Sequence, residues 1–201
     1  MELKPEDKHK LEALKAAMLA NFLDVCPKHA GYVEAAEAGG FHDIVPNQLN
    51  CSQTIVRFAL SVLGYDPALV SVARYCGAGV ARTGHICGAL SGTAIALGIR
   101  DFHLGEQWAD ATVAADEDHA VQGTEEASHL RADAAVAANV DRLQRMFEDF
   151  RNEFGGTTCK ELTGYDDLIG VEDYNRFRED EISQRCADYL AWAFDRLYEM
   201  L

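Results

Sequence analysis

Six cysteines are the residues of this 201-residue chain best suited to do chemistry, and they stand at positions 26, 51, 76, 87, 159 and 186. A thiolate can act as a nucleophile, a metal ligand or half of a disulfide. No two of these cysteines form a Cys-x-x-Cys pair, which argues against zinc ribbons, thioredoxins and ferredoxins. No Cys-x-x-Cys-His sequence occurs either, so covalent c-type haem is not indicated. Spacing alone leaves the role of the thiols open.

The positions of three cysteines are more informative than their spacing. The capping-box patterns Asn50–Gln53 and Thr158–Glu161 predict helix starts that carry Cys51 and Cys159 at the first helical position. Cys87 falls in the opening turn of a third predicted helix. The free N–H groups and positive dipole end of a helix start stabilise a thiolate, and they can also hydrogen-bond a metal-bound sulfur. These three thiols are therefore candidates for ligation or redox chemistry.

A plain packing role stands beside this hypothesis, because free cysteine is among the most buried residue types. Cys51 and Cys186 both lie on apolar helix stripes. His85 is a candidate neighbour of a metal at Cys87, but a histidine at such a position is more often a surface or hydrogen-bonding residue. The turn around Cys26 resembles a metal-binding turn only weakly. We expect three further histidines to be solvated, since their surroundings are acidic and polar: His103, His119 and His129.

The apolar spacing predicts an all-α fold, a compact bundle of six to seven helices, and no segment alternates like a strand. A long acidic connection is expected over residues 101–123, where the periodicity fades. Gly84, Gly88 and Gly92 stand four apart and predict close helix packing, which we interpret as a contact across a homodimer. The expected helices cover residues 6–23, 50–63, 67–75, 85–99, 125–154 and 179–201.

The charge restricts the partners. With 33 acidic and 18 basic residues the net charge is −15, which disfavours nucleic acid and anionic membrane surfaces and suits a basic redox partner protein. No apolar run is long enough to span a bilayer, and residues 1–10 lack the apolar core of a secretory signal. We therefore expect a cytoplasmic protein with reduced thiols.

Four separated motifs stand in the order of a known family: NCSQ at 50–53, GAGVARTGHICGALSG at 77–92, TCKEL at 158–162 and Cys186. The sequence over residues 47–201 resembles the redox-active family named for the pattern C…GCAxxG…C…C, which includes the non-haem part of the split-Soret cytochromes c. The chain departs from the name by reading Cys87-Gly88-Ala89. The resemblance implies that Cys51, Cys87, Cys159 and Cys186 are iron–sulfur ligands and that the protein transfers electrons. Haem attachment sites are absent, so a cytochrome role is not implied.

The leading hypothesis is a redox domain at residues 47–201, preceded by an N-terminal helical extension at 1–46. Its four cysteines would hold a 2Fe–2S or 4Fe–4S cluster. Three alternatives stay open: a structural zinc site in an interaction module, a thiol-disulfide enzyme in which Cys159 attacks and Cys51 or Cys87 resolves, and a bundle with buried thiols only.

Overall fold

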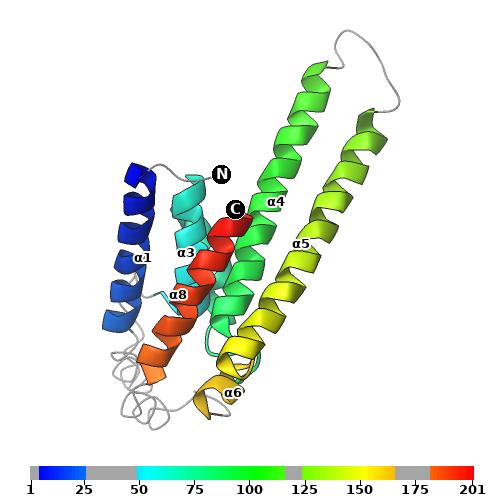
Figure 1. The fold of residues 1–201 in the computed structure, drawn as a ribbon. Helices are drawn as coiled ribbons and strands as arrows, with labels where there is room; N and C mark the ends of the chain where they lie inside the picture. The colour runs from blue at the N-terminus through cyan, green and yellow to red at the C-terminus, as the bar shows by residue number, and fades with distance from the viewer. Residues whose placement is uncertain (1–4, 26–48, 116–123, 166–181) are drawn as a thin grey trace, which may run out of the picture.

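The computed structural model describes residues 5–25, 49–115, 124–165 and 182–201 (Figure 1). These residues form a helical bundle, which confirms the predicted fold class, and they contain no strand beyond one isolated β-bridge. Side chains are described for 6–23, 49–103, 136–165 and 182–201. The elements in chain order are α1 (Pro5–Val25), α3 (Cys51–Leu63), the 3₁₀ helix η3 (Pro67–Cys76), α4 (Gly88–Ala115), α5 (Thr124–Phe154), α6 (Cys159–Thr163) and α8 (Ile182–Met200).

Capping residues that can be recognised in the sequence set several of the helix ends. Asn50 forms the predicted capping box with Gln53, and Gly64 ends α3 in the left-handed conformation. Asp66 caps η3 through the N–H of Ala68. In the folded chain α3, α4, α6 and α8 all start at one end of the bundle, and α5 ends there (Figure 1).

The glycine-rich start of α4 packs inside the chain. A Cβ on Gly88 would lie 2.6 Å from the Cβ of Cys51, and one on Gly92 would lie 2.7 Å from the carbonyl oxygen of Ser52. The predicted close packing is therefore confirmed, with α3 as the partner helix. Since Gly88 and Gly92 already face α3, this glycine face gives no support to a homodimer contact, and the homodimer itself stays a prediction.

The end of α4 and the surroundings of His103 differ from the sequence prediction. The predicted acidic connection at 101–123 is wrong over its first part, because α4 continues to Ala115; alanine-rich sequence sustains a helix even where its apolar periodicity fades. The rest, 116–123 with His119, lies outside the described residues, as do Cys26, residues 179–181 and the side chain of His129. The prediction of a solvated His103 is also wrong, because its half-buried ring lies 4.5 Å from that of Tyr65.

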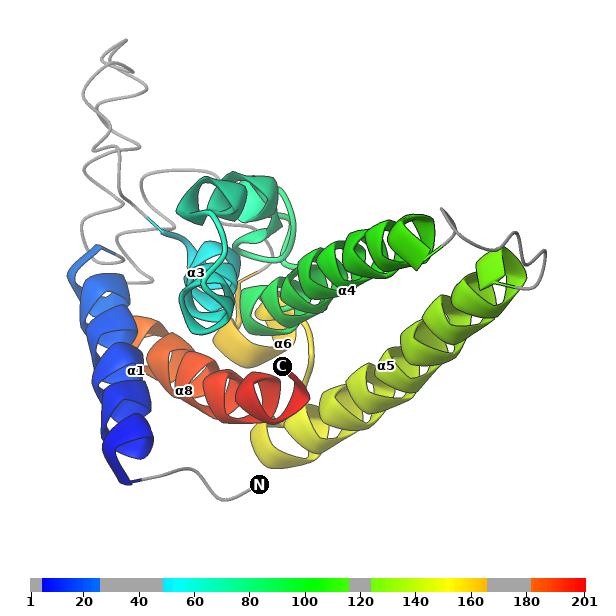
Figure 2. The same ribbon diagram turned by 90° about the horizontal axis from the view of Figure 1, so that it is seen from above.

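The core lies between α3, α4 and α8, and Phe58 and Phe194 meet at its centre with ring centroids 4.5 Å apart. Helix α1 packs on α8 and α3, where it buries Phe22 and pairs Lys15 with Asp195. Seen from above in Figure 2, α1 lies at one side of α8 and α3, while the far end of α4 and the start of α5 extend away from the core at the other side. None of the helices described here combines the length and apolarity that crossing a membrane requires.

Candidate functional site

All four predicted cysteines line one small cavity at the end of the bundle where the helices start. Cys51 comes from α3, Cys87 from the residue before α4, Cys159 from α6 and Cys186 from α8. The cavity measures about 20 Å³, which is room for roughly one water-sized group and is far below the several hundred Å³ of an organic cofactor pocket. Its other lining residues are mostly apolar: Ala78, Gly88, Ala89, Leu162, Thr163, Tyr189 and Leu190.

A short backbone pairing holds Cys87 beside Cys159. Ile86 and Thr158 form an antiparallel β-bridge, and the N–H of Cys87 donates to the carbonyl oxygen of Thr157 at 2.8 Å. In return the N–H of Cys159 donates to the carbonyl oxygen of His85 at 2.6 Å. Two segments more than seventy residues apart in the chain are thus fixed by main-chain bonds, independently of the thiols.

This pairing also corrects two predictions about the start of α4. The helix was expected from residue 85, but the backbone of residues 85–87 is engaged with α6, so α4 begins at Gly88. Cys87 consequently lies just before the helix, and its carbonyl oxygen accepts from the N–H groups of Leu90 and Ser91. The His85 side chain is exposed and does not line the cavity, so its contribution here is its carbonyl oxygen.

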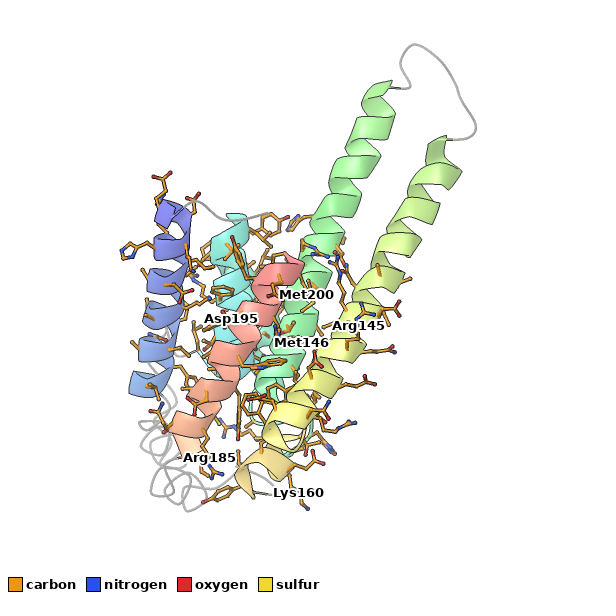
Figure 3. All side chains as sticks on the ribbon, viewed as in Figure 1. Arg145, Met146, Lys160, Arg185, Asp195 and Met200 are labelled. Carbon is orange, nitrogen blue, oxygen red and sulfur yellow. The ribbon has the colours of Figure 1, made fainter. Side chains whose placement is uncertain are left out.

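Glu161 stabilises the loop that carries Cys159. Its carboxylate accepts hydrogen bonds from the N–H of Thr157, the N–H of Thr158 and the hydroxyl of Thr158, each at 2.9 Å. The Thr158 hydroxyl oxygen accepts from the Glu161 N–H at 3.1 Å, which completes the predicted capping box. The N–H groups of Thr158 and Thr157, followed by the Thr158 hydroxyl, lower the pKa of the Glu161 carboxyl. Figure 3 shows the neighbouring Lys160, with Arg185 of α8, at this end of the molecule.

A left-handed turn covers Cys51, and the sequence did not reveal it. Residues 78–82 all have positive φ, although only Gly79 among them is a glycine. The N–H groups of Ala81, Gly84 and His85 donate back to carbonyl oxygens of residues 75, 78 and 79, which closes the turn. The N–H of Ala78 hydrogen-bonds the sulfur of Cys51. The glycines at 77 and 79 were the available signal, and they indicated only a bend.

The region that forms this cavity matches a protein-family model. The model described as Putative redox-active protein (C_GCAxxG_C_C) matches residues 49–200, more than half of the chain. The chain belongs to this family. The match contains all four cavity cysteines and leaves α1 outside. No curated protein and no solved structure matches the chain.

The thiols of this redox-active family member differ in their ease of ionisation. Hydrogen bonds from the Cys186 thiol, then from the N–H groups of Cys51 and Ala78, lower the pKa of Cys51 against the opposing effect of burial. Burial, and next the negative charge of Cys51, raise the pKa of Cys87 well above its usual range. The same two causes raise the pKa of Cys159 to about 12. Of these three thiols, Cys51 is therefore the one that ionises most readily.

Backbone donors also reach Cys87. The N–H groups of Ala89 and Leu90, in the first turn of α4, lie within reach of its sulfur and partly oppose the effect of burial on its pKa, although the Leu90 N–H also donates to the Cys87 carbonyl oxygen at 3.0 Å. At Cys159 the Thr163 hydroxyl lies within hydrogen-bonding reach of the thiol, and it donates to the Cys159 carbonyl oxygen at 2.7 Å. Because a hydroxyl has one proton, it serves one of these acceptors at a time. Ala78, Thr163 and Tyr189 complete the surroundings that sequence reasoning missed.

The four cysteine sulfurs are the right type of ligand for an iron–sulfur cluster or a zinc ion, and they lie around one cavity. They do not form a coordination shell in this structure. Within the described ranges, no three or more His, Cys, Asp or Glu side chains are arranged to hold a metal ion. Four thiolates in one buried cavity would repel each other strongly, so full ionisation requires a cation among them. Cys76, at the end of η3, does not line the cavity.

Proposed function

We propose that this member of the redox-active family binds an iron–sulfur cluster through Cys51, Cys87, Cys159 and Cys186 and transfers electrons. The observation that supports the proposal is the convergence of these four thiols, from four separate elements, on one small cavity. Bound there, the cluster would supply one-electron transfer. The thiols would turn toward a common centre on binding, because they do not form a coordination shell in this structure.

The backbone around the cavity suits such a group. N–H groups of Cys51 and Ala78 reach the Cys51 sulfur, and those of Ala89 and Leu90 reach the Cys87 sulfur. N–H···S bonds stabilise negative charge on ligand sulfurs and tune the reduction potential of a bound cluster. The side chains that line the rest of the cavity are mostly apolar, which would lower the polarity around a bound cluster.

The partner we propose is a basic redox protein. The net charge of −15 gives the molecule a field that attracts a positively charged surface and repels polyanions. Electron transfer to such a partner is expected to slow as ionic strength rises, because salt screens long-range attraction.

The deciding experiment is purification without oxygen, followed by an absorption spectrum and analysis of iron, zinc and acid-labile sulfide. We expect a coloured protein with iron and sulfide in equal amounts. Serine replacements at Cys51, Cys87, Cys159 and Cys186 should each abolish or strongly reduce the colour. Cys76→Ser is the matched control, since Cys76 is described and does not line the cavity, and it should leave the spectrum unchanged.

Two results would contradict the proposal. A colourless protein with stoichiometric zinc would assign the thiols to a redox-silent structural site. Bleaching by Cys76→Ser together with full colour in Cys186→Ser would show that the ligand set is wrong.

A further inference from the structure

An apolar stripe on α5 continues beyond the part of the helix that the core covers. Its members follow one another at alternating spacings of four and three residues: Val136, Val140, Leu143, Phe147 and Phe150. Phe150 is fully buried, Phe147 and Leu143 are half-buried, and Val140 and Val136 are 46% and 50% exposed. The stripe thus leaves the core and becomes exposed toward the start of the helix. We call Val136, Val140, Leu143 and Phe147 the α5 seam.

The hairpin of α4 and α5 reaches past the rest of the described bundle. In Figure 1 the far end of α4 and the start of α5 extend beyond α1, α3 and α8, and Figure 2 shows the same part pointing away from the core. In neither view does another described helix lie along the outer side of α5. Helices in proteins gain most of their stability by packing an apolar face against another element. The exposed part of the α5 seam is therefore suited to a further helix.

The charges around the α5 seam favour a second copy of this chain as the source of that helix. The positions that flank the seam are uncharged: Ala137, Asn139, Gln144 and Met146. The outward positions from 136 to 148 carry two acidic and two basic side chains: Asp141, Arg142, Arg145 and Glu148. This surface is thus neutral in a chain of net charge −15, so two identical chains can meet here without the repulsion that their overall charge produces. A strongly basic partner gains no attraction from a neutral surface.

The α5 seam is also complementary to itself. Its four-three spacing is that of the contact positions of a coiled coil. If two seams lie side by side in opposite directions, Val140 packs beside Leu143 of the second copy, and Val136 packs beside Phe147. Each layer then combines a smaller side chain with a larger one. Every contact also occurs twice, as a two-fold axis requires.

We propose that two copies of the protein pair through their α5 seams in antiparallel orientation, so that two α4–α5 hairpins form a four-helix interface. This surface differs from the glycine face of α4, which is already packed against α3 inside the chain. Because α5 ends at the cavity end of the bundle, the antiparallel pairing places the two thiol cavities at opposite ends of the dimer. The inference goes beyond the proposed electron transfer and needs neither a metal nor a thiol.

Sedimentation velocity of the full chain over a wide range of concentrations tests the pairing. We expect a species of twice the chain mass that dissociates on dilution. Val140→Glu places one carboxylate from each copy in the seam, so it should raise the dissociation constant of the dimer by at least about a hundredfold. Circular dichroism should show an unchanged helix content, since this side chain is 46% exposed within one chain.

The matched control is Val72→Glu. Val72 lies on η3 and is 55% exposed, so the same chemical change falls on a different exposed apolar surface. The control should leave the dissociation constant unchanged. A single-chain mass at every concentration would overturn the proposal, and so would a dimer that Val140→Glu leaves intact or that Val72→Glu dissociates.

Hydrogen exchange gives a test that does not depend on a variant. Amides of residues 136–147 in the unsubstituted chain should exchange more slowly at a concentration where the dimer predominates than at one where it has dissociated. Amides of η3 should exchange equally at both concentrations, and the reverse pattern would assign the contact to η3. Iron and sulfide analysis tests the cluster separately, so a monomeric protein with a full cluster, or a dimer without one, shows which of the two proposals has failed.

Discussion

The N–H of Cys159 donates to the carbonyl oxygen of His85 at 2.6 Å, so the backbone of one cavity cysteine is bound to the segment that carries another. The reciprocal bond from the N–H of Cys87 to Thr157, at 2.8 Å, completes the pairing. Neither bond involves a sulfur atom. The cavity walls around Cys87 and Cys159 are therefore formed by the backbone before any group binds, and replacing a thiol by a hydroxyl leaves these bonds in place.

The close contact between α3 and α4 can be tested with two glycine-to-alanine substitutions in α4. Gly88→Ala should destabilise the protein by about 1–3 kcal/mol, because its Cβ would overlap the Cys51 side chain, with 2.6 Å between the Cβ atoms. Gly98→Ala, on the same helix with no atom within 4 Å of the new Cβ, should stabilise it by up to about 1 kcal/mol. Urea unfolding followed by circular dichroism measures both. Equal effects of the two changes would contradict the close packing at Gly88.

The left-handed turn at 78–82 permits a second matched pair. Ala81 is exposed with φ of 51°, and a non-glycine residue in this region costs about 1–2 kcal/mol. Ala81→Gly should therefore stabilise the fold by about 0.5 kcal/mol, after the greater entropy of glycine in the unfolded chain is subtracted.

The control for this prediction is Ala68→Gly. Ala68 is equally exposed, but it lies in η3 and is not among the described residues with positive φ. The same chemical change there should destabilise the protein by about 0.5–1 kcal/mol. Thermal unfolding of the two variants side by side checks the opposite signs, and a loss of stability in both would argue against a left-handed Ala81.

The sequence predicted the local parts of this site and missed the parts that depend on distant pairing. Capping boxes are short-range signals, so the helix starts at Cys51 and Cys159 are confirmed. The start of α4 was displaced because residues 85–87 pair with a segment that lies beyond α5, and no local pattern shows that pairing. The turn at 78–82 was missed for a different reason: Val80 and Ala81 do not favour positive φ, and hydrogen bonds within the segment 75–85 hold them in it.

The meeting of the four thiols at one cavity also could not be predicted from local sequence patterns. Helix periodicity places Cys186 on a buried stripe, and capping places two other thiols at helix starts, but neither shows which helix ends meet. The order of the motifs, through the family resemblance, was the signal that grouped Cys51, Cys87, Cys159 and Cys186. The contact between Cys51 and Cys186 came from the structure alone.

The Glu161 carboxylate predicts a pH dependence of stability. Its hydrogen bonds lower its pKa in the folded state, so its contribution is present above the ordinary pKa of an unfolded glutamate and is lost as the pH falls through the folded pKa. Glu161→Gln keeps one acceptor oxygen but removes the charge. The variant should be less stable than the unsubstituted protein at neutral pH, and the difference should shrink on acidification below about pH 4.

Chemical unfolding at a series of pH values measures this effect. Glu148→Gln, on the exposed face of α5, provides the control for loss of one acidic charge and should show no such pH-dependent difference. A stability difference for Glu161→Gln that stays constant from neutral to acidic pH would exclude the carboxylate charge as its cause.

Helix α1 lies outside the family match, yet Phe22 is 2% exposed where α1 packs on the core. Phe22→Ala should destabilise the protein by about 3–5 kcal/mol, because it removes a buried ring and leaves a cavity. If α1 and the four-cysteine region unfold as one unit, the loss should appear in a single transition, seen equally by circular dichroism and by fluorescence of Trp192 on α8 in a Trp108→Phe background. Phe102→Ala, where the side chain is 65% exposed, should change stability by less than about 0.5 kcal/mol. Two separate transitions, with only the first shifted by Phe22→Ala, would instead make residues 1–46 an extension that folds and unfolds apart from the thiol cavity.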